Sequence, residues 1–277
     1  AAAAYSVRLL RTAYTGDIMR VRRDSDNVEV DVGFDSNDEF GLTSPVSNAS
    51  SGGPFTDFAD FIGHGGTPAN GFCRYWYDQS GNANDAEQAT QARQPKIYDS
   101  STGIIEEGAV GKEKPALDFL GTTITGLDAT GIAMTQPFSG FYTIGNFSQT
   151  PTNSSYIHGG TISSNRIIFS NVTAGGVPNL NAGAALAAAS TADVGQNIFS
   201  SLYDSTTSEL WQKGVSVASG NAGTRDCSGL RIGVRYNYTT YTMESTMQEI
   251  IFYDSDQDAA GNRSGIETNM NGFYNVF

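Results

Sequence analysis

The sequence is poor in cysteine and histidine. Among 277 residues there are two cysteines, Cys73 and Cys227, and two histidines, His64 and His158. A disulfide framework needs more cysteines, and a structural zinc site needs four Cys or His ligands at close spacing. We therefore expect no metal and no cofactor. The two cysteines form either one bridge or two buried free thiols, and the spacing does not choose between these.

Basic residues and long apolar runs are also scarce. The chain carries 16 Lys and Arg against 29 Asp and Glu, which gives a net charge of −13. Nucleic-acid phosphates and anionic membrane surfaces both require clustered Lys and Arg, so we expect neither partner. No apolar run approaches the ~20 residues of a membrane-spanning helix. We therefore predict no membrane insertion.

What the chain does have is glycine, aromatic residues and many short apolar stretches. It contains 32 glycines and 11% aromatics, and only 16% of its residues are charged. Short alternating runs with turn residues between them are typical of a β-sandwich or barrel. No boundary divides the chain, and an all-β domain of this length is common. The sequence therefore predicts one all-β domain over residues 1–277.

The pattern also predicts a few short helices. Residues 4–12 and 54–62 place apolar residues on one helical face. Asp256 is predicted to cap a final helix whose Ile266, Met270 and Phe273 face inward.

A charged hairpin is predicted near the N-terminus. Residues 18–23 and 28–34 alternate in hydropathy and are separated by a polar turn. Arg20 and Arg22 face Glu29 and Asp31 across this hairpin. We interpret the four charges as a solvated face of the sheet.

The most distinctive stretch is an aromatic run, residues 72–77, followed by a polar turn. Asp and Asn side chains fold back on local backbone groups, and glycine permits a positive φ. This predicts a buried strand ending in a specified turn, built by the structural residues Tyr77, Asp78, Gln79, Ser80 and Gly81. A ligand role for Asp78 or Gln79 is the alternative.

Residues 77–82, with the sequence YDQSGN, resemble the YDQSG motif of the arabinofuranosidase B catalytic domain. The opening at 13–16 (AYTG) and the charged stretch at 21–27 resemble that family's N-terminal pattern. The resemblance implies a concanavalin-A-like jelly-roll β-sandwich. Sequences with this opening, this motif and a closing helix are similar to phage tail and other virion proteins.

The catalytic carboxylates of that family are not matched. A retaining or inverting glycosidase needs a proton-donating acid and a second carboxylate. The family's acid follows an IGG segment, where this chain has residues 232–235 (IGVR), so Arg235 takes its place and cannot usefully donate a proton. Residues 138–197 contain no Glu that matches the nucleophile. Asp226 and Glu244 could substitute in principle, but nothing in the sequence favours them.

A binding patch is the remaining hypothesis. Sugars stack on aromatic rings and hydrogen-bond to nearby polar groups. The resemblance places residues 235–241 near the family's cleft, and this stretch carries Arg235, Tyr236, Tyr238 and Tyr241. Trp211, the fifth candidate, lies on the preceding hairpin, which is predicted over residues 210–217 with its turn at 212–214. Alternate tyrosines also occur as ordinary cross-strand packing, and that alternative stays open.

These observations favour a non-catalytic module of a virion surface or tail, and thus an extracellular location. Its expected partners are a host cell-surface glycan and other virion proteins. A homo-oligomer such as a trimer is compatible with such an appendage, although nothing in the sequence counts subunits. The alternatives are an arabinofuranosidase-like glycoside hydrolase and a purely structural virion subunit without a ligand.

Overall fold

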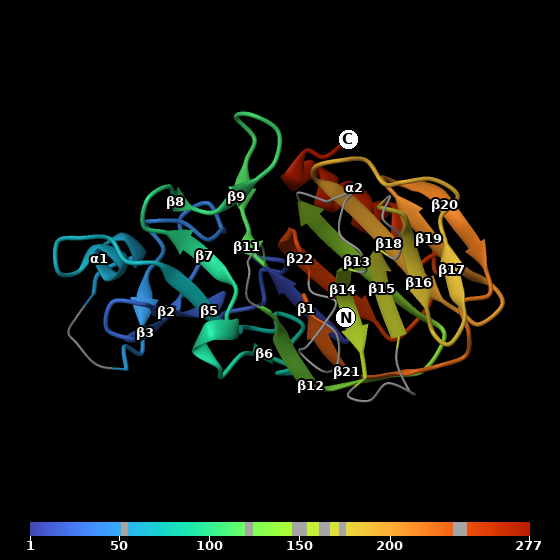
Figure 1. Cartoon of the computed structure of the whole chain (residues 1–277), viewed down its shortest axis with the longest axis horizontal. Coiled ribbons are helices and arrows are strands. Elements are labelled where there is room, and N and C mark those ends of the chain that lie inside the picture. The colour runs from blue at the N-terminus through green and yellow to red at the C-terminus, as the bar shows by residue number, and fades with distance from the viewer. Residues whose placement is uncertain (51–54, 120–123, 146–153, 161–166, 172–175, 235–242) are drawn as a thin grey trace.

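The computed structural model describes residues 1–277 except 51–54, 120–123, 146–153, 161–166, 172–175 and 235–242. The described chain is mostly β-structure, so the predicted all-β class is confirmed (Figure 1). Its elements are β1 Ala3–Ser6, β2 Met19–Arg23, β3 Glu29–Val32, β4 Val46–Ser47, α1 Phe58–Gly63, β5 Gly71–Trp76, β6 Ala86–Glu87, η1 Gln91–Arg93, β7 Lys96–Asp99, β8 Gly103–Ile104, β9 Glu106–Glu107, β10 Lys114–Pro115, β11 Leu117–Asp118, β12 Leu127–Met134, β13 Phe138–Gly145, β14 Ser154–Gly159, β15 Ile167–Asn171, β16 Pro178–Asn181, β17 Ala185–Ala187, β18 Asn197–Tyr203, β19 Ser208–Gln212, β20 Val215–Gly220, β21 Cys227–Ile232, β22 Thr246–Tyr253 and α2 Arg263–Tyr274.

Two antiparallel layers form the C-terminal part of the fold. One layer runs β20–β19–β18–β13–β22–β1, and the other runs β17–β16–β15–β14–β21–β12. Rings from the two layers meet between them: Phe169 of β15 stacks on Tyr142 of β13 at 4.9 Å and lies 5.1 Å from Phe199 of β18. Burial of such large aromatic side chains supplies much of the driving force for packing two sheets together.

The N-terminal part continues both layers. β2 pairs with β3 and β5, and β5 pairs with β7. β11 connects β7 to β22, while β6 connects β5 to β12. Helix α1 covers the far end of this sheet, where Phe58 lies 5.9 Å from Tyr98 (Figure 1). Asp57 caps α1 by accepting a hydrogen bond from the backbone N–H of Asp60.

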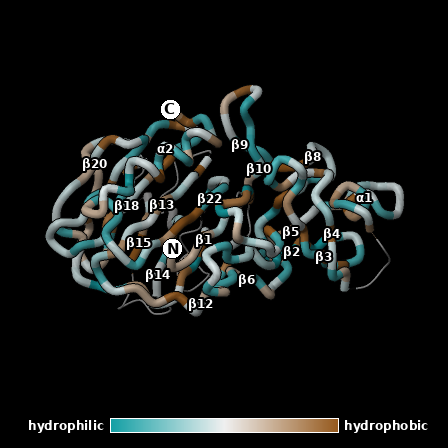
Figure 2. The backbone as a smooth tube through the Cα atoms, turned by 180° about the vertical axis from the view of Figure 1, so that it is seen from behind, coloured by the Kyte–Doolittle hydropathy of each residue, from teal (hydrophilic) through white to brown (hydrophobic). Residues whose placement is uncertain are grey.

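Strand β22 lies in the middle of the molecule, and Figure 2 shows hydrophobic residues along it. It pairs with β13 on one edge and with β1 on the other. The helix predicted for residues 4–12 is therefore wrong, because β1 occupies the start of this segment. Ala3, Ala4 and Tyr5 are buried there, and pairing with β22 outweighs the helix propensity of the alanines.

The charged hairpin forms as predicted, with Arg20 opposite Asp31 and Arg22 opposite Glu29. The interpretation of these charges as a solvated face is wrong. Asp31 is 3% exposed and accepts hydrogen bonds from Arg20, Asn48 and Tyr77. Buried charges persist when they are paired and fully hydrogen-bonded. Asn48 and Tyr77 come from outside the hairpin, so its hydropathy pattern could not predict them.

The final helix exists but begins later than predicted. α2 starts after Asn262, whereas Asp256 accepts hydrogen bonds within the preceding turn, from the N–H groups of residues 258 and 259. Met270 is buried as predicted, while Ile266 and Phe273 are only partly buried. In the part of the chain that the structure describes, no helix is long and apolar enough to cross a membrane.

The structure also describes the predicted second hairpin and the state of the two cysteines. The hairpin predicted around residues 212–214 is confirmed, with Lys213 and Gly214 both at positive φ between β19 and β20, as a tight hairpin turn requires. Cys73 and Cys227 are both buried free thiols.

Candidate functional site

The turn that follows β5 is built around Asp78. The Asp78 carboxylate is 3% exposed and accepts four hydrogen bonds. Their donors are the backbone N–H groups of Ala4, Ser80 and Asn84, at 2.8, 2.8 and 3.0 Å, and the Ser80 hydroxyl, at 2.7 Å. A carboxylate whose lone pairs are satisfied in this way serves a structural purpose. We call residues 77–84 the β5 corner.

Gln79 fastens the N-terminal segment to the same corner. Its backbone N–H donates to the Ala4 carbonyl. Its side-chain oxygen accepts from the N–H of Leu10, and its side-chain nitrogen donates to the carbonyls of Ser6 and Arg8. The corner therefore completes the edge of β1 that β22 leaves open.

Helix α2 is anchored beside this corner by a buried ion pair. Arg8 binds the Glu249 carboxylate through Nε and Nη2, at 2.8 and 3.0 Å. Ser6 and Tyr274 also donate to Glu249, at 2.9 and 3.0 Å. Arg8 Nη2 further donates to Asn269 Oδ1 at 2.7 Å. Since its oxygen is thus occupied, Asn269 presents its NH₂ group as a donor.

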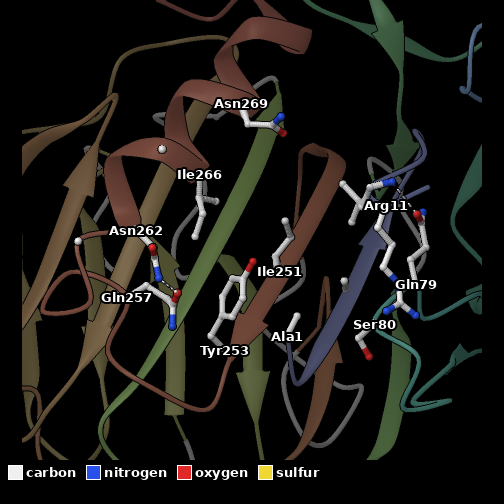
Figure 3. Close-up of a pocket in the computed structure, with 14 residues that line it drawn as sticks. Ala1, Arg11, Gln79, Ser80, Ile251, Tyr253, Gln257, Asn262, Ile266 and Asn269 are labelled. Carbon is white, nitrogen blue, oxygen red and sulfur yellow. Dashed lines mark hydrogen bonds between the residues drawn. The ribbon is translucent and has the colours of Figure 1, made fainter. Parts of the chain in front are cut away.

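A pocket of about 620 Å³ lies between the β5 corner, the β1–β22 pair and α2 (Figure 3). We call it the helix pocket. Its lining combines an apolar floor with amide, hydroxyl and guanidinium groups and includes no carboxylate: Leu10, Arg11, Gln79, Ser80, Ile251, Tyr253, Gln257, Asn262, Gly265, Ile266 and Asn269 line it, with Ala1, Ala4 and Gly261. Ligand sites typically have volumes of about 300–1,000 Å³ and this mixture of apolar wall and few polar groups.

Helix α2 contributes a glycine, Gly265, to the lining of the pocket. A Cβ atom built at Gly265 meets nothing within 4 Å. Glycine inside a helix costs about 1 kcal/mol relative to alanine, and no packing contact requires it here. Gly272, further along α2, is equally unobstructed but lines a different, smaller hollow.

A second hollow of about 350 Å³ lies at the β5 corner and carries acidic groups. Burial, followed by repulsion from Asp31, raises the pKa of Asp17. Burial is also the main cause that raises the pKa of Asp85, and it raises the pKa of the Tyr14 hydroxyl to about 12. Carboxyls with raised pKa are the type that glycosidases use as acids.

The structure describes one of the five members of the predicted binding patch, so the patch stays a prediction. Trp211 is 5% exposed, and the Arg263 guanidinium covers its ring at 4.4 Å. This leaves no open face for a sugar to stack on. The other four members, Arg235, Tyr236, Tyr238 and Tyr241, lie outside the described residues.

The two substitute carboxylates also lie apart from the helix pocket lining. Asp226 accepts a hydrogen bond from the backbone N–H of Gln136, and Glu244 is exposed. Within the described ranges, no group of three or more His, Cys, Asp or Glu side chains is arranged to hold a metal ion.

Sequence reasoning missed the residues that do meet at the helix pocket, among them Arg11, Tyr253, Gly265 and Asn269. The one available signal was the pair of glycines, Gly265 and Gly272, inside an otherwise regular helical pattern, since an interior glycine needs a reason.

Comparison with known proteins gives the fold. No protein-family model and no curated protein matches the sequence. Among solved structures, an arabinofuranosidase complexed with arabinofuranosyl-α-1,2-xylobiose is similar over 96% of this chain, with a TM-score of 0.62 and 16% identity. A GH54 α-L-arabinofuranosidase soaked with a cyclic sulfate inhibitor is similar over the same share, with a TM-score of 0.66 and 12% identity.

The chain has an arabinofuranosidase-like fold. It spans 62% of the length of each of these two chains, so part of each lies beyond the likeness. At identities of 16% and 12% the similarity shows the fold alone, and a shared fold does not imply a shared function.

Proposed function

We propose that residues 1–277 form a single concanavalin-A-like β-sandwich module that binds a glycan without hydrolysing it. The observation that carries the proposal is the helix pocket. It sets apolar groups, Ile251 and the Tyr253 ring, beside an amide that Arg8 holds in one orientation. Sugars present apolar faces and hydroxyl groups, and preorganised polar partners reduce the cost of binding them.

We further propose that the module sits on a virion surface or tail, where it contacts a host cell-surface glycan and other virion proteins. This part rests on the resemblance of the N-terminal pattern and the YDQSGN stretch to phage proteins. We keep residues 235–241 as a second place where the glycan binds, because this stretch of the sequence carries three tyrosines.

Glycoside hydrolysis is the second candidate function, and the fold likeness to two arabinofuranosidases favours it more directly than it favours a virion role. Against hydrolysis stand Arg235 at the position of the family's acid and the lack of Glu in residues 138–197. Release of a chromophore from an aryl arabinofuranoside separates the two candidates. A rate that falls in Asp17→Asn or Asp85→Asn would assign hydrolysis to the acidic hollow.

The binding proposal is tested with a glycan array and a variant that fills the helix pocket. Gly265→Leu places a side chain in open space and improves helix propensity, so the variant is expected to fold. Gly272→Leu is the matched control, with the same chemical change on the same helix outside the pocket. We expect binding to be lost only in Gly265→Leu. Binding that survives in Gly265→Leu and disappears in Tyr236→Ala/Tyr238→Ala would move the site to residues 235–241.

A further inference from the structure

We infer that the glycan unit held in the helix pocket bears a carboxylate, as uronic and sialic acids do, and that Arg11 recognises it. This inference rests on the proposed function and names its ligand class. Its starting point is the charge of the pocket. The whole molecule has a net charge of −13, yet the pocket lining includes one arginine and no Asp or Glu.

Arg11 is free to bind an anion. It is exposed, and it takes part in none of the ion pairs of the described residues. The other arginines near α2 are committed: Arg8 to Glu249, and Arg263 to Asp258 and Glu267. A guanidinium presents its N–H groups in a fork that matches a carboxylate in two parallel hydrogen bonds.

The Asp78 carboxylate does not compete for Arg11. The guanidinium lies against Gly81, which lines the acidic hollow, and beside Ser80, which lines the helix pocket (Figure 3). Asp78 in the same corner already accepts three backbone hydrogen bonds and one from Ser80. Its acceptor sites are filled by these partners, which leaves Arg11 to an external anion.

The remaining polar groups suit the rest of such a sugar. Asn269 offers an NH₂ donor because Arg8 occupies its oxygen. Across the pocket Asn262 donates to the Gln257 side chain at 3.2 Å, which leaves the Asn262 oxygen as an acceptor. The Tyr253 hydroxyl points into the space between them (Figure 3). Donors and one acceptor around an apolar floor match the hydroxyls and the ring face of a sugar, while Arg11 matches its carboxylate.

The test compares hexuronate or sialic acid oligosaccharides with the same oligosaccharides after reduction of the carboxyl group to an alcohol, by titration calorimetry on the whole chain. We expect the acidic forms to bind more tightly, and Arg11→Gln to weaken them about 10–100-fold, the range for a charge-assisted hydrogen bond. Arg11→Gln should leave the reduced forms unchanged. Lys112→Gln removes one positive charge elsewhere on the surface and should change neither.

Equal affinity for acidic and reduced forms, or no effect of Arg11→Gln, would overturn the carboxylate assignment. If Gly265→Leu still abolishes binding in that case, the glycan pocket stands and only its ligand class is wrong. If no glycan binds, or Gly265→Leu binds normally, the proposed site itself fails.

Discussion

Replacing Gln79 by methionine tests how much the β5 corner stabilises the fold. Methionine is unbranched and similar in length, so the change removes hydrogen bonds with little change in volume. Gln79 is 1% exposed and bonds to the backbone of Ser6, Arg8 and Leu10. The Ser6 carbonyl keeps the Trp76 indole N–H as a donor, at 3.3 Å. Two backbone groups, the Arg8 carbonyl and the Leu10 N–H, thus lose their partner.

Each buried polar group left without a partner costs about 1–3 kcal/mol. The Arg8 carbonyl is buried, whereas the Leu10 N–H is only partly buried. The expected loss is therefore about 1–4 kcal/mol, a sizeable part of the ~5–15 kcal/mol that stabilises a typical domain. Urea unfolding followed by tryptophan fluorescence measures it as a lower midpoint at an unchanged slope. Gln91→Met, at an exposed site, should stay within about 0.5 kcal/mol of the parent chain. A midpoint for Gln79→Met equal to that of Gln91→Met would refute the assignment.

Three further predictions follow from individual side chains. Burial works to raise the pKa of Asp31, but hydrogen bonds from Arg20, Tyr77 and Asn48 outweigh it and lower that pKa. The ionised Asp31 carboxylate therefore contributes to the free energy of unfolding. This contribution is complete above the pKa of Asp31 in the unfolded chain, about 3.9, and is lost as the pH falls through its lower pKa in the folded chain. Asp31→Asn should lower stability at pH 7 and flatten the acid limb of the stability curve, and an unchanged limb would contradict this. Burial raises the pKa of the Cys227 thiol to about 12 and raises that of Cys73 further; Ellman's reagent at pH 8 should label two thiols only after denaturation, and rapid labelling of the native chain would count against their burial. Gly265→Ala should raise the free energy of unfolding by about 1 kcal/mol, seen as a higher urea midpoint, whereas a lower midpoint would mean that the site is not open.

The sequence patterns correctly predicted those elements whose stabilising contacts lie between residues close together in the sequence. The β2–β3 hairpin alternates in hydropathy and is closed by a short turn, so its register follows from the sequence. The turn at Lys213 and Gly214 follows in the same way. The aromatic run at residues 72–77 was predicted as a buried strand with a polar turn because Asp and Asn side chains fold back on local backbone groups, as Asp78 does with the Ser80 N–H.

The predictions failed where a residue's structure depends on partners that are distant in the sequence. Ala3 and Tyr5 join a strand because residues 250–252 lie beside them, and no pattern within residues 4–12 contains that information. Asp31 is buried because Tyr77 and Asn48 reach it from other segments. The helix pocket could not be predicted for the same reason, since its walls come from residues 10–11, 79–80, 251–257 and 261–269.

The contacts that stabilise the fold also shape the helix pocket, so binding there is coupled to the docking of α2. Glu249 is fully buried and holds Arg8, which in turn orients Asn269 on α2. Removing one partner of a buried ion pair leaves the other charge uncompensated, at a cost of about 3–5 kcal/mol. Substituting Arg8 would therefore release both the helix and the Asn269 donor. Filling the pocket at Gly265 removes the binding space alone. A ligand that binds this pocket only in the folded chain must therefore raise the free energy of unfolding with the logarithm of one plus its free concentration divided by its Kd.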